Sequence, residues 1–156
     1  MKTFFLLIAI IVSTSINAQD LVWHTDMNKA IEIAQKENKK IMLFFTGSDW
    51  CGWCIRLQNE VLKKPEFAAW ATKNVVLVDV DFPKKNNQTD AIKAQNSGLQ
   101  QMFEVKGYPT VWFVNVSKNA EGKVNLEKLG STGYVAGGPA NWIGGADQIL
   151  LNGTPK

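Results

Sequence analysis

The sequence predicts a mixed α/β sandwich, in which helices cover both faces of a sheet that has parallel and antiparallel parts. Apolar runs at residues 41–45, 75–78 and 110–114 are too short for helices and are typical of strands buried on both faces. Segments with helical spacing separate these runs, and strands joined by helices are usually parallel. A turn at residues 119–122 leads to a further strand at residues 124–129, which indicates an antiparallel hairpin.

The first helix and the first strand follow each other closely. Between residues 26 and 38, apolar residues recur at helical spacing among Lys, Glu and Gln, which predicts a helix on the surface of a core. Thr25 or Asp26 is placed to cap its start, since a short side-chain oxygen can accept the free N–H groups of a first turn. The strand at residues 41–45 comes next, and the polar residues 46–49 end it.

A second helix follows the cysteine pair, because apolar residues again recur at helical spacing up to residue 62. Pro65 suits the first position of another short helix, where its missing N–H costs nothing. The strand at residues 75–78, extended to Val80, then ends at residues 81–83.

The second half of the chain carries two more predicted helices. Residues 90–104 have helical spacing, but we expect two pieces or a kink near Ser97 and Gly98. The glycine-rich residues 130–138 are typical of a loop, and Pro139 can start a closing helix. The sequence contains no internal repeat and no interdomain linker.

The N-terminus has the pattern of a secretory signal peptide. Lys2 precedes an apolar run at residues 4–12, and small polar residues lead to Ala18, after which we expect cleavage. An uncleaved membrane anchor is the alternative, but the run is shorter than the roughly 20 residues that span a bilayer. The sequence therefore predicts a signal peptide at residues 1–18 and one soluble domain at residues 19–156, located in the periplasm or secreted.

Composition and charge argue against several classes of partner. The chain has 17 Lys and Arg, 14 Asp and Glu, and a formal net charge of +3. Its lysine pairs, at residues 39–40, 63–64 and 84–85, are scattered along the sequence and are interpreted as solvated faces. We therefore expect neither nucleic acid nor a membrane surface as a partner.

The chain contains only two cysteines, Cys51 and Cys54. A disulfide across so short a loop constrains the unfolded chain little, so its purpose is expected to be chemical. At a strand-to-helix junction the first cysteine lies at the helix N-terminus, where free N–H groups and the helix dipole lower the pKa of its thiol. Cys51 is therefore the predicted nucleophile and Cys54 the thiol that releases the product. Trp50 and Trp53 flank the pair as apolar surface on which a polypeptide could dock.

Three other interpretations of the cysteine pair were weighed. Covalent haem attachment requires His directly after the second cysteine, where this chain has Ile55. A zinc site needs about two more ligands, and the only histidine, His24, is distant in sequence and is expected to be a surface or edge residue. A purely structural disulfide stays open, since export would oxidise any adjacent pair. We expect no metal and no organic cofactor.

Two motifs together resemble the thioredoxin superfamily. They are WCGWC at residues 50–54, after an apolar strand and before a helix, and Gly-Tyr-Pro-Thr at residues 107–110, before another strand. The resemblance covers roughly residues 21–151. It implies a three-layer sandwich, exchange of disulfides with protein substrates, a cis peptide bond at Pro109, and a substrate-facing backbone at Tyr108.

The chain also departs from thioredoxin itself. Thioredoxin has Gly-Pro between its cysteines, whereas this chain has Gly52 and Trp53, and alignment places Phe45 and Leu77 where thioredoxin has a buried Asp and a Lys that assist proton transfer. Losing both charges together avoids leaving one buried and unpaired. The chain is therefore more similar to exported, Trp-flanked bacterial thioredoxin-like proteins, and the proton acceptor for Cys54 is open. Three nearby carboxylates are candidates for it: Asp49, Asp79 and Asp81.

These features predict an exported thiol-disulfide oxidoreductase, with a slight preference for a reductase. In an oxidising compartment a reductase needs an electron donor, such as a membrane thiol transporter, and an oxidase needs a re-oxidising partner. The first alternative is a binding or chaperone-like module that presents its aromatic residues and the glycine-rich residues 130–145 to a partner. The second is a maturation factor for one client, such as a cytochrome.

Overall fold

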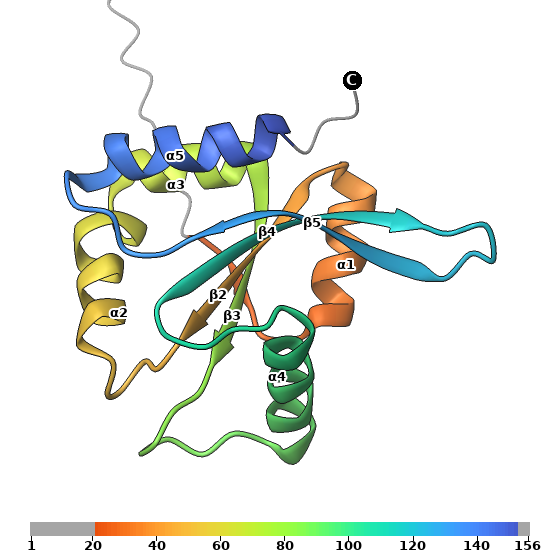
Figure 1. The fold of residues 1–156 in the computed structure, drawn as a ribbon, viewed down its shortest axis with the longest axis horizontal. Coiled ribbons are helices and arrows are strands. Elements are labelled where there is room, and N and C mark those ends of the chain that lie inside the picture. The colour runs from red at the N-terminus through yellow and green to blue at the C-terminus, as the bar shows by residue number, and fades with distance from the viewer. Residues whose placement is uncertain (1–20, 153–156) are drawn as a thin grey trace, which may run out of the picture.

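The computed structural model describes residues 21–152, which form a five-stranded sheet in the order β1-β3-β2-β4-β5 (Figure 1). The strands are β1 (Trp23–His24), β2 (Lys40–Thr46), β3 (Val75–Asp81), β4 (Thr110–Lys118) and β5 (Val124–Thr132). β1, β3 and β2 are parallel, and β4 and β5 form an antiparallel hairpin that joins the edge of β2. The predicted mixed sheet with a late hairpin is confirmed.

Helices cover both faces of this sheet (Figure 1). They are α1 (Met27–Glu37), α2 (Gly52–Leu57), the π-helical turn η1 (Gln58–Leu62), α3 (Pro65–Asn74), α4 (Asp90–Met102) and α5 (Gly138–Asn152). One core cluster packs α2, η1, α3 and α5 on one face, and a second packs α1 and α4 on the other. The three-layer sandwich implied by the resemblance is therefore confirmed.

Local sequence explains where these elements begin and why they are buried. Asp26 caps α1, because its carboxylate accepts the backbone N–H groups of Asn28 and Lys29. Pro65 occupies the first turn of α3. In β2 every residue after Lys40 is buried, as expected for a central strand covered on both faces.

α4 is one continuous helix, so the prediction of two pieces near Ser97 and Gly98 is wrong. Both residues are exposed, and a Cβ at Gly98 would meet nothing within 4 Å. The neighbouring Asn96 and Leu99 are buried and anchor the helix on the sheet. A single exposed glycine costs only about 1 kcal/mol relative to alanine, and this anchoring outweighs it.

The predicted loop at residues 130–138 is shorter than expected, because β5 continues to Thr132. The pairing of β4 and β5 contains a register shift between Phe113 and Val114, opposite Gly130. Gly130 has φ 156°, and a Cβ there would lie 2.9 Å from Cγ2 of Ile149 in α5. Glycine at this position therefore lets α5 approach β5 closely.

The short strand β1 was not predicted, since two residues carry no readable pattern. It pairs with β3 at the edge of the sheet and contains His24, which agrees with the prediction of an edge residue. The predicted signal peptide, residues 1–18, lies outside the described residues. Among residues 21–152 no helix has the length and apolar character needed to cross a bilayer.

Candidate active site

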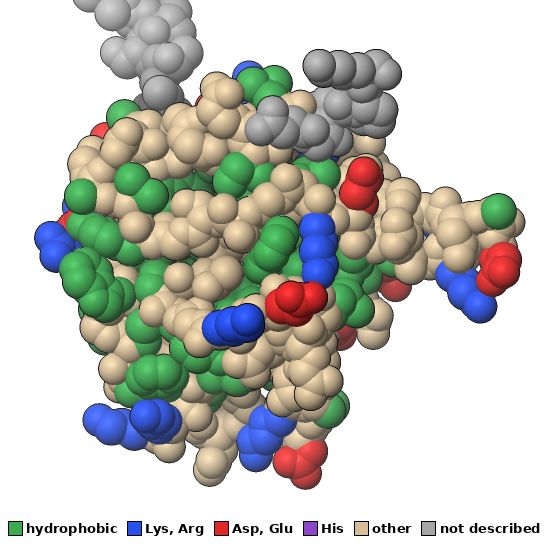
Figure 2. All heavy atoms as spheres, viewed as in Figure 1, with side chains coloured by type: hydrophobic (Ala, Val, Ile, Leu, Met, Phe, Trp, Pro, Cys, Tyr) green, Lys and Arg blue, Asp and Glu red, His purple; other side chains and the backbone are tan. Residues whose placement is uncertain are grey.

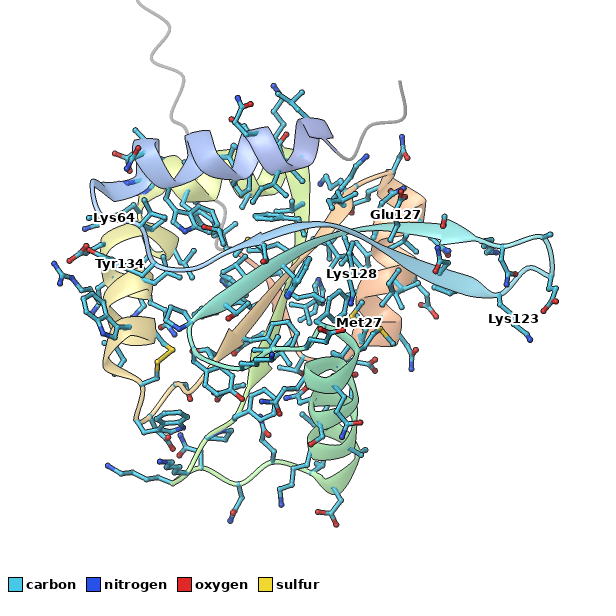
Figure 3. The ribbon with its side chains drawn as sticks, viewed as in Figure 1. Met27, Lys64, Lys123, Glu127, Lys128 and Tyr134 are labelled. Carbon is cyan, nitrogen blue, oxygen red and sulfur yellow. A yellow bond between two sulfur atoms is a disulfide. The ribbon has the colours of Figure 1, made fainter. Side chains whose placement is uncertain are left out.

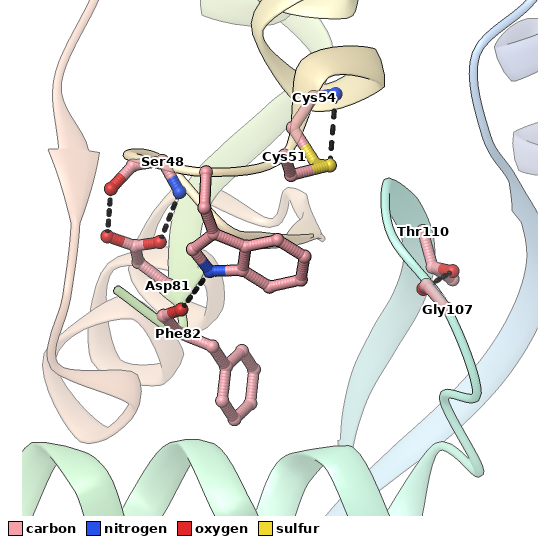
Figure 4. The surroundings of a disulfide bond; sticks show 8 residues. Ser48, Cys51, Cys54, Asp81, Phe82, Gly107 and Thr110 are labelled. Atoms are coloured by element: carbon pink, nitrogen blue, oxygen red, sulfur yellow. Dashed lines mark hydrogen bonds between the residues drawn. A yellow bond between two sulfur atoms is a disulfide. The ribbon is translucent and has the colours of Figure 1, made fainter. Parts of the chain in front are cut away.

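A disulfide joins Cys51 and Cys54 at the N-terminus of α2 (Figure 4). Cys51 is the N-cap residue, and its Sγ accepts the backbone N–H of Cys54 at 3.2 Å. Cys54 is fully buried, whereas 6% of Cys51 is exposed. An N–H directed at Sγ stabilises negative charge there, so the site favours a thiolate on the more accessible sulfur.

The turn before Cys51 is bound to the end of β3 and the residue that follows it (Figure 4). Asp81 accepts both the backbone N–H and the hydroxyl of Ser48, at 2.8 and 2.5 Å. The indole Nε1 of Trp50 donates to the carbonyl of Phe82 at 2.8 Å. The indole also lies over Gly47, where a Cβ would approach Nε1 to 2.6 Å. These contacts fix the turn that carries Cys51.

Asp49 extends this attachment to the loop between β3 and α4. Its carboxylate accepts the backbone N–H of Lys84 at 3.0 Å, of Lys85 at 2.6 Å and of Asn86 at 3.2 Å. These hydrogen bonds, first that from the Lys84 N–H and then those from Lys85 and Asn86, lower the pKa of the Asp49 carboxyl. Asp49 therefore holds the loop as a carboxylate.

The predicted substrate-facing segment lies on the other side of Trp50. The peptide bond between Tyr108 and Pro109 is cis, as the resemblance implied. The ring of Tyr108 meets the indole of Trp50 edge-on, with centroids 5.8 Å apart, and its hydroxyl accepts a hydrogen bond from Gln100 at 2.7 Å. Burial raises the pKa of the Tyr108 hydroxyl. The structure thus brings Trp50, Tyr108 and the cis bond together beside the cysteine turn.

Trp53 belongs to a second aromatic group that the sequence did not reveal. Its ring packs on Tyr134 at 5.2 Å, and the guanidinium of Arg56 lies over both rings, at 5.3 and 5.1 Å from their centroids. Glu60 accepts hydrogen bonds from Arg56 at 2.7 Å and from Tyr134 at 2.6 Å. The Tyr134 bond, and then the Arg56 bond, lower the pKa of the Glu60 carboxyl. Tyr134, in the loop between β5 and α5, is thereby fastened beside α2 (Figure 3).

Asp79 is the one described carboxylate with a buried oxygen that has no hydrogen-bond partner. It faces a cavity of about 280 Å³ that it lines together with Trp23, Phe44, Gln58, Leu62 and Lys63. Burial, and secondarily the charge of Asp81, raise the pKa of the Asp79 carboxyl to about 7. The hydroxyl oxygen of Thr46, in β2, is likewise buried without a hydrogen-bond partner.

Phe45 and Leu77 lie in different core clusters. Phe45 pairs with Val80, and Leu77 pairs with Met42. The two positions aligned with the charged pair of thioredoxin are therefore on opposite faces of this sheet, and both are filled by apolar packing.

A redox cysteine pair at a helix N-terminus, on a mixed sheet with helices on both faces, defines a protein-disulfide oxidoreductase. The sequence profile of the thioredoxin-like domain matches residues 27–134. The chain belongs to this family.

Named relatives agree with this class. Over 121 residues the chain is 38% identical to the "Disulfide bond reductase DsbH" of Chlamydia pneumoniae, a match that covers 78% of this chain and 72% of that protein. It is 27% identical to the "Thioredoxin-related protein DsbJ" of the same organism, of which the match covers 33%. A solved structure described as "DsbH Oxidoreductase" superposes with a TM-score of 0.73 at 32% identity, covering 97% of this chain and 95% of the other.

Proposed function

We propose that this oxidoreductase is an exported reductase of protein disulfides, in which Cys51 attacks the substrate and Cys54 releases it. The observation that carries this assignment is the hydrogen bond from the Cys54 N–H to Sγ of Cys51. Cys51 is also the more exposed of the two cysteines. A thiolate at Cys51 is both stabilised and within reach of a substrate.

The reaction consists of two thiol-disulfide exchanges. The Cys51 thiolate bonds to one sulfur of the substrate disulfide, whose S–S bond breaks, and the other substrate sulfur leaves as a thiolate. Cys54 loses its proton and attacks Cys51, so the second substrate sulfur also leaves. The enzyme supplies two electrons and keeps the Cys51–Cys54 disulfide, and the two substrate thiolates take up two protons, one equivalent to the proton lost by Cys54 and one from solvent. A thiol donor of lower potential must then reduce the enzyme.

Aromatic residues around the cysteines supply the surface for a polypeptide substrate. Trp50 and Trp53 are 40% and 55% exposed, which is unusual for the largest apolar side chains. Tyr108 and Pro109 lie beside Trp50 and offer backbone to an extended chain. We assign substrate contact to these four residues.

Asp79 is our choice among the three candidate proton acceptors. Asp49 accepts three backbone N–H groups and Asp81 binds Ser48, so both are engaged in holding the active-site turn. Asp79 has a free buried oxygen and a pKa near neutrality. Its cavity contains Gln58, one helical turn after Cys54, and Phe44 and Leu62, which share a core cluster with Cys54.

Reduction is favoured over oxidation by the similarity to the disulfide bond reductase DsbH, and export is favoured by the signal-peptide pattern. Because an exported reductase works against an oxidising environment, we expect a membrane thiol transporter or a similar donor as its redox partner. A reduction potential near the reducing end of the superfamily range, about −270 mV, supports this direction, and a value near about −120 mV contradicts it.

The central test is reduction of an insulin-like disulfide with dithiothreitol present. We expect Cys51→Ser to abolish enzyme-dependent turnover, and full activity of this variant would remove Cys51 from its assigned role. Cys54→Ser should instead accumulate mixed disulfides through Cys51, visible on non-reducing gels. A protein that only binds its partners would form no such adducts, which separates catalysis from a chaperone-like role.

A further inference from the structure

We infer that lysines around the active site bind acidic polypeptide segments next to the disulfide that is reduced. This inference rests on the proposed function and names its substrate class. The three lysines are Lys84, Lys85 and Lys106, called the lysine rim below. They are far apart in sequence from the cysteines, and the fold brings them to one end of the sheet.

Lys84 stands directly beside the cysteine turn. Its Nζ lies 4.3 Å from the centroid of the Trp50 ring, a cation–π contact. The loop that carries Lys84 and Lys85 does not swing freely, because Asp49 accepts the backbone N–H groups of both residues. The ammonium group of Lys84 is therefore held next to Trp50, with the backbone of Lys85 fixed beside it, and a substrate docked on this indole meets the Lys84 charge.

Lys106 belongs to the segment that leads to the cis peptide bond. It is exposed and immediately precedes Gly107, which leads to Tyr108 and the cis bond at Pro109. Among the described residues, no ion pair involves any member of the lysine rim. Glu104 lies two residues before Lys106 and offsets part of its charge.

Asp49 and Asp81 near the cysteines stay charged, but their oxygens face neutral donors of the protein, and neither forms an ion pair with the lysine rim among the described residues. Asp49 is bound by backbone N–H groups, and Asp81 is bound by Ser48. Glu60 is neutralised by Arg56 on the far side of Trp53. On the face shown in Figure 2, Lys or Arg side chains stand beside hydrophobic ones near the start of α2 and the β3–α4 loop.

Unpaired cations beside an exposed aromatic surface attract an acidic chain and orient it before exchange. Such steering acts mainly on the association rate, is weakened by salt, and disfavours a basic chain in the same place. The lysine rim therefore selects disulfides that have Asp or Glu close by in sequence.

The test compares two synthetic peptides that contain the same internal disulfide, one flanked by Glu and the other by Lys. At low ionic strength, ~20 mM, we expect kcat/KM to be about tenfold higher for the Glu peptide, and this ratio should shrink towards one in ~0.5 M salt. The double variant Lys84→Gln and Lys85→Gln should lose most of the ratio. The matched control, Lys36→Gln and Lys73→Gln, removes two exposed lysines at the other end of the sheet and should keep it.

Equal kcat/KM for the two peptides, or an equal loss of the ratio in the control variant, would overturn the inference. Binding is measured separately, by calorimetry with the oxidised enzyme and peptides in which Ser replaces both Cys. If the enzyme reduces no disulfide but still binds the Glu peptide more tightly, the proposed reductase function is refuted and the binding role of the lysine rim is supported. If the enzyme reduces both peptides and binds them equally, only the role of the lysine rim is refuted.

Discussion

Asp81 accepts two hydrogen bonds from Ser48, at 2.8 Å from its backbone N–H and at 2.5 Å from its hydroxyl. The pair joins the end of β3 to the turn before the cysteines. Asp81→Ala leaves both donors of a part-buried residue without their acceptor. Because a hydrogen bond to a charged group contributes about 1.5–3 kcal/mol, we expect a loss of stability on that order in urea unfolding. Ser48→Ala keeps the backbone bond, so a loss as large as that of Asp81→Ala would contradict this account.

Gly47→Ala should damage the site through Trp50. The new methyl group would lie 2.6 Å from the indole Nε1, so the ring must move and its hydrogen bond to Phe82 is lost. We expect destabilisation of about 1–3 kcal/mol and lower activity on protein disulfides. Gly144→Ala is the matched control, because its methyl group meets nothing within 4 Å. It lies in α5, so it should be neutral or stabilising by up to about 1 kcal/mol.

Stability should depend on pH through Asp79. Its pKa is about 7 in the folded protein and 3.8 ordinarily, so between these values the folded state holds a proton that the unfolded state has released. The contribution of Asp79 to the free energy of unfolding is therefore greatest below pH 3.8, and it falls as the pH rises to about 7. Asp79→Asn should therefore be more stable than the parent above pH 7, by up to about 4 kcal/mol, and nearly equal to it at pH 4. Urea unfolding at both pH values measures this, and a pH-independent difference would refute it.

The control for that series is Asp90→Asn, whose carboxylate is fully exposed. The same Asp79→Asn variant also tests the proton acceptor. If Asp79 takes the proton from Cys54, the pH profile for release of the mixed disulfide should lose a transition near pH 7. An unchanged profile would confine Asp79 to an effect on stability.

Alanine substitutions of the two tryptophans that flank the cysteines should differ in their effect on stability. Trp53 is 55% exposed, no hydrogen bond from its indole occurs among the described contacts, and Trp53→Ala removes only its ring contacts with Tyr134 and Arg56. We expect it to lower kcat/KM for protein disulfides several-fold with a stability loss of about 1 kcal/mol. Trp50→Ala removes the hydrogen bond to Phe82 as well as the ring contact with Tyr108, so it should lose more stability. Thermal unfolding and turnover of an insulin-like substrate distinguish them, and equal stability losses would argue against this division.

Several features could be predicted because their cause is local. The strands at residues 41–45 and 75–78 are continuous apolar runs, and a strand buried on both faces has that pattern. A cap at Thr25 or Asp26 could also be predicted, because capping depends only on neighbouring residues, and the structure shows that it is Asp26. The cysteine junction combines a motif with the strand and helix around it, so its position at the start of α2 was also predictable.

The missed features depend on contacts between distant residues. The hydrogen bond between Tyr134 and Glu60 joins residues 74 positions apart, and nothing around Tyr134 in sequence indicates that its partner lies in η1. Lys84 was assigned to a solvated face, because only the fold places it over Trp50. The break expected near Gly98 is absent because tertiary packing outweighed a local preference.

Three consecutive residues before Cys51 each hold a different part of the end of β3 and the segment that follows it: Ser48 binds Asp81, Asp49 binds the N–H groups of residues 84–86, and Trp50 binds Phe82. The WCGWC pentapeptide is therefore not a portable module. Transplanting it into another scaffold would carry the sulfurs without the groups that orient them. A functional graft would have to include residues 47–50 and 81–86 as a matched pair of segments.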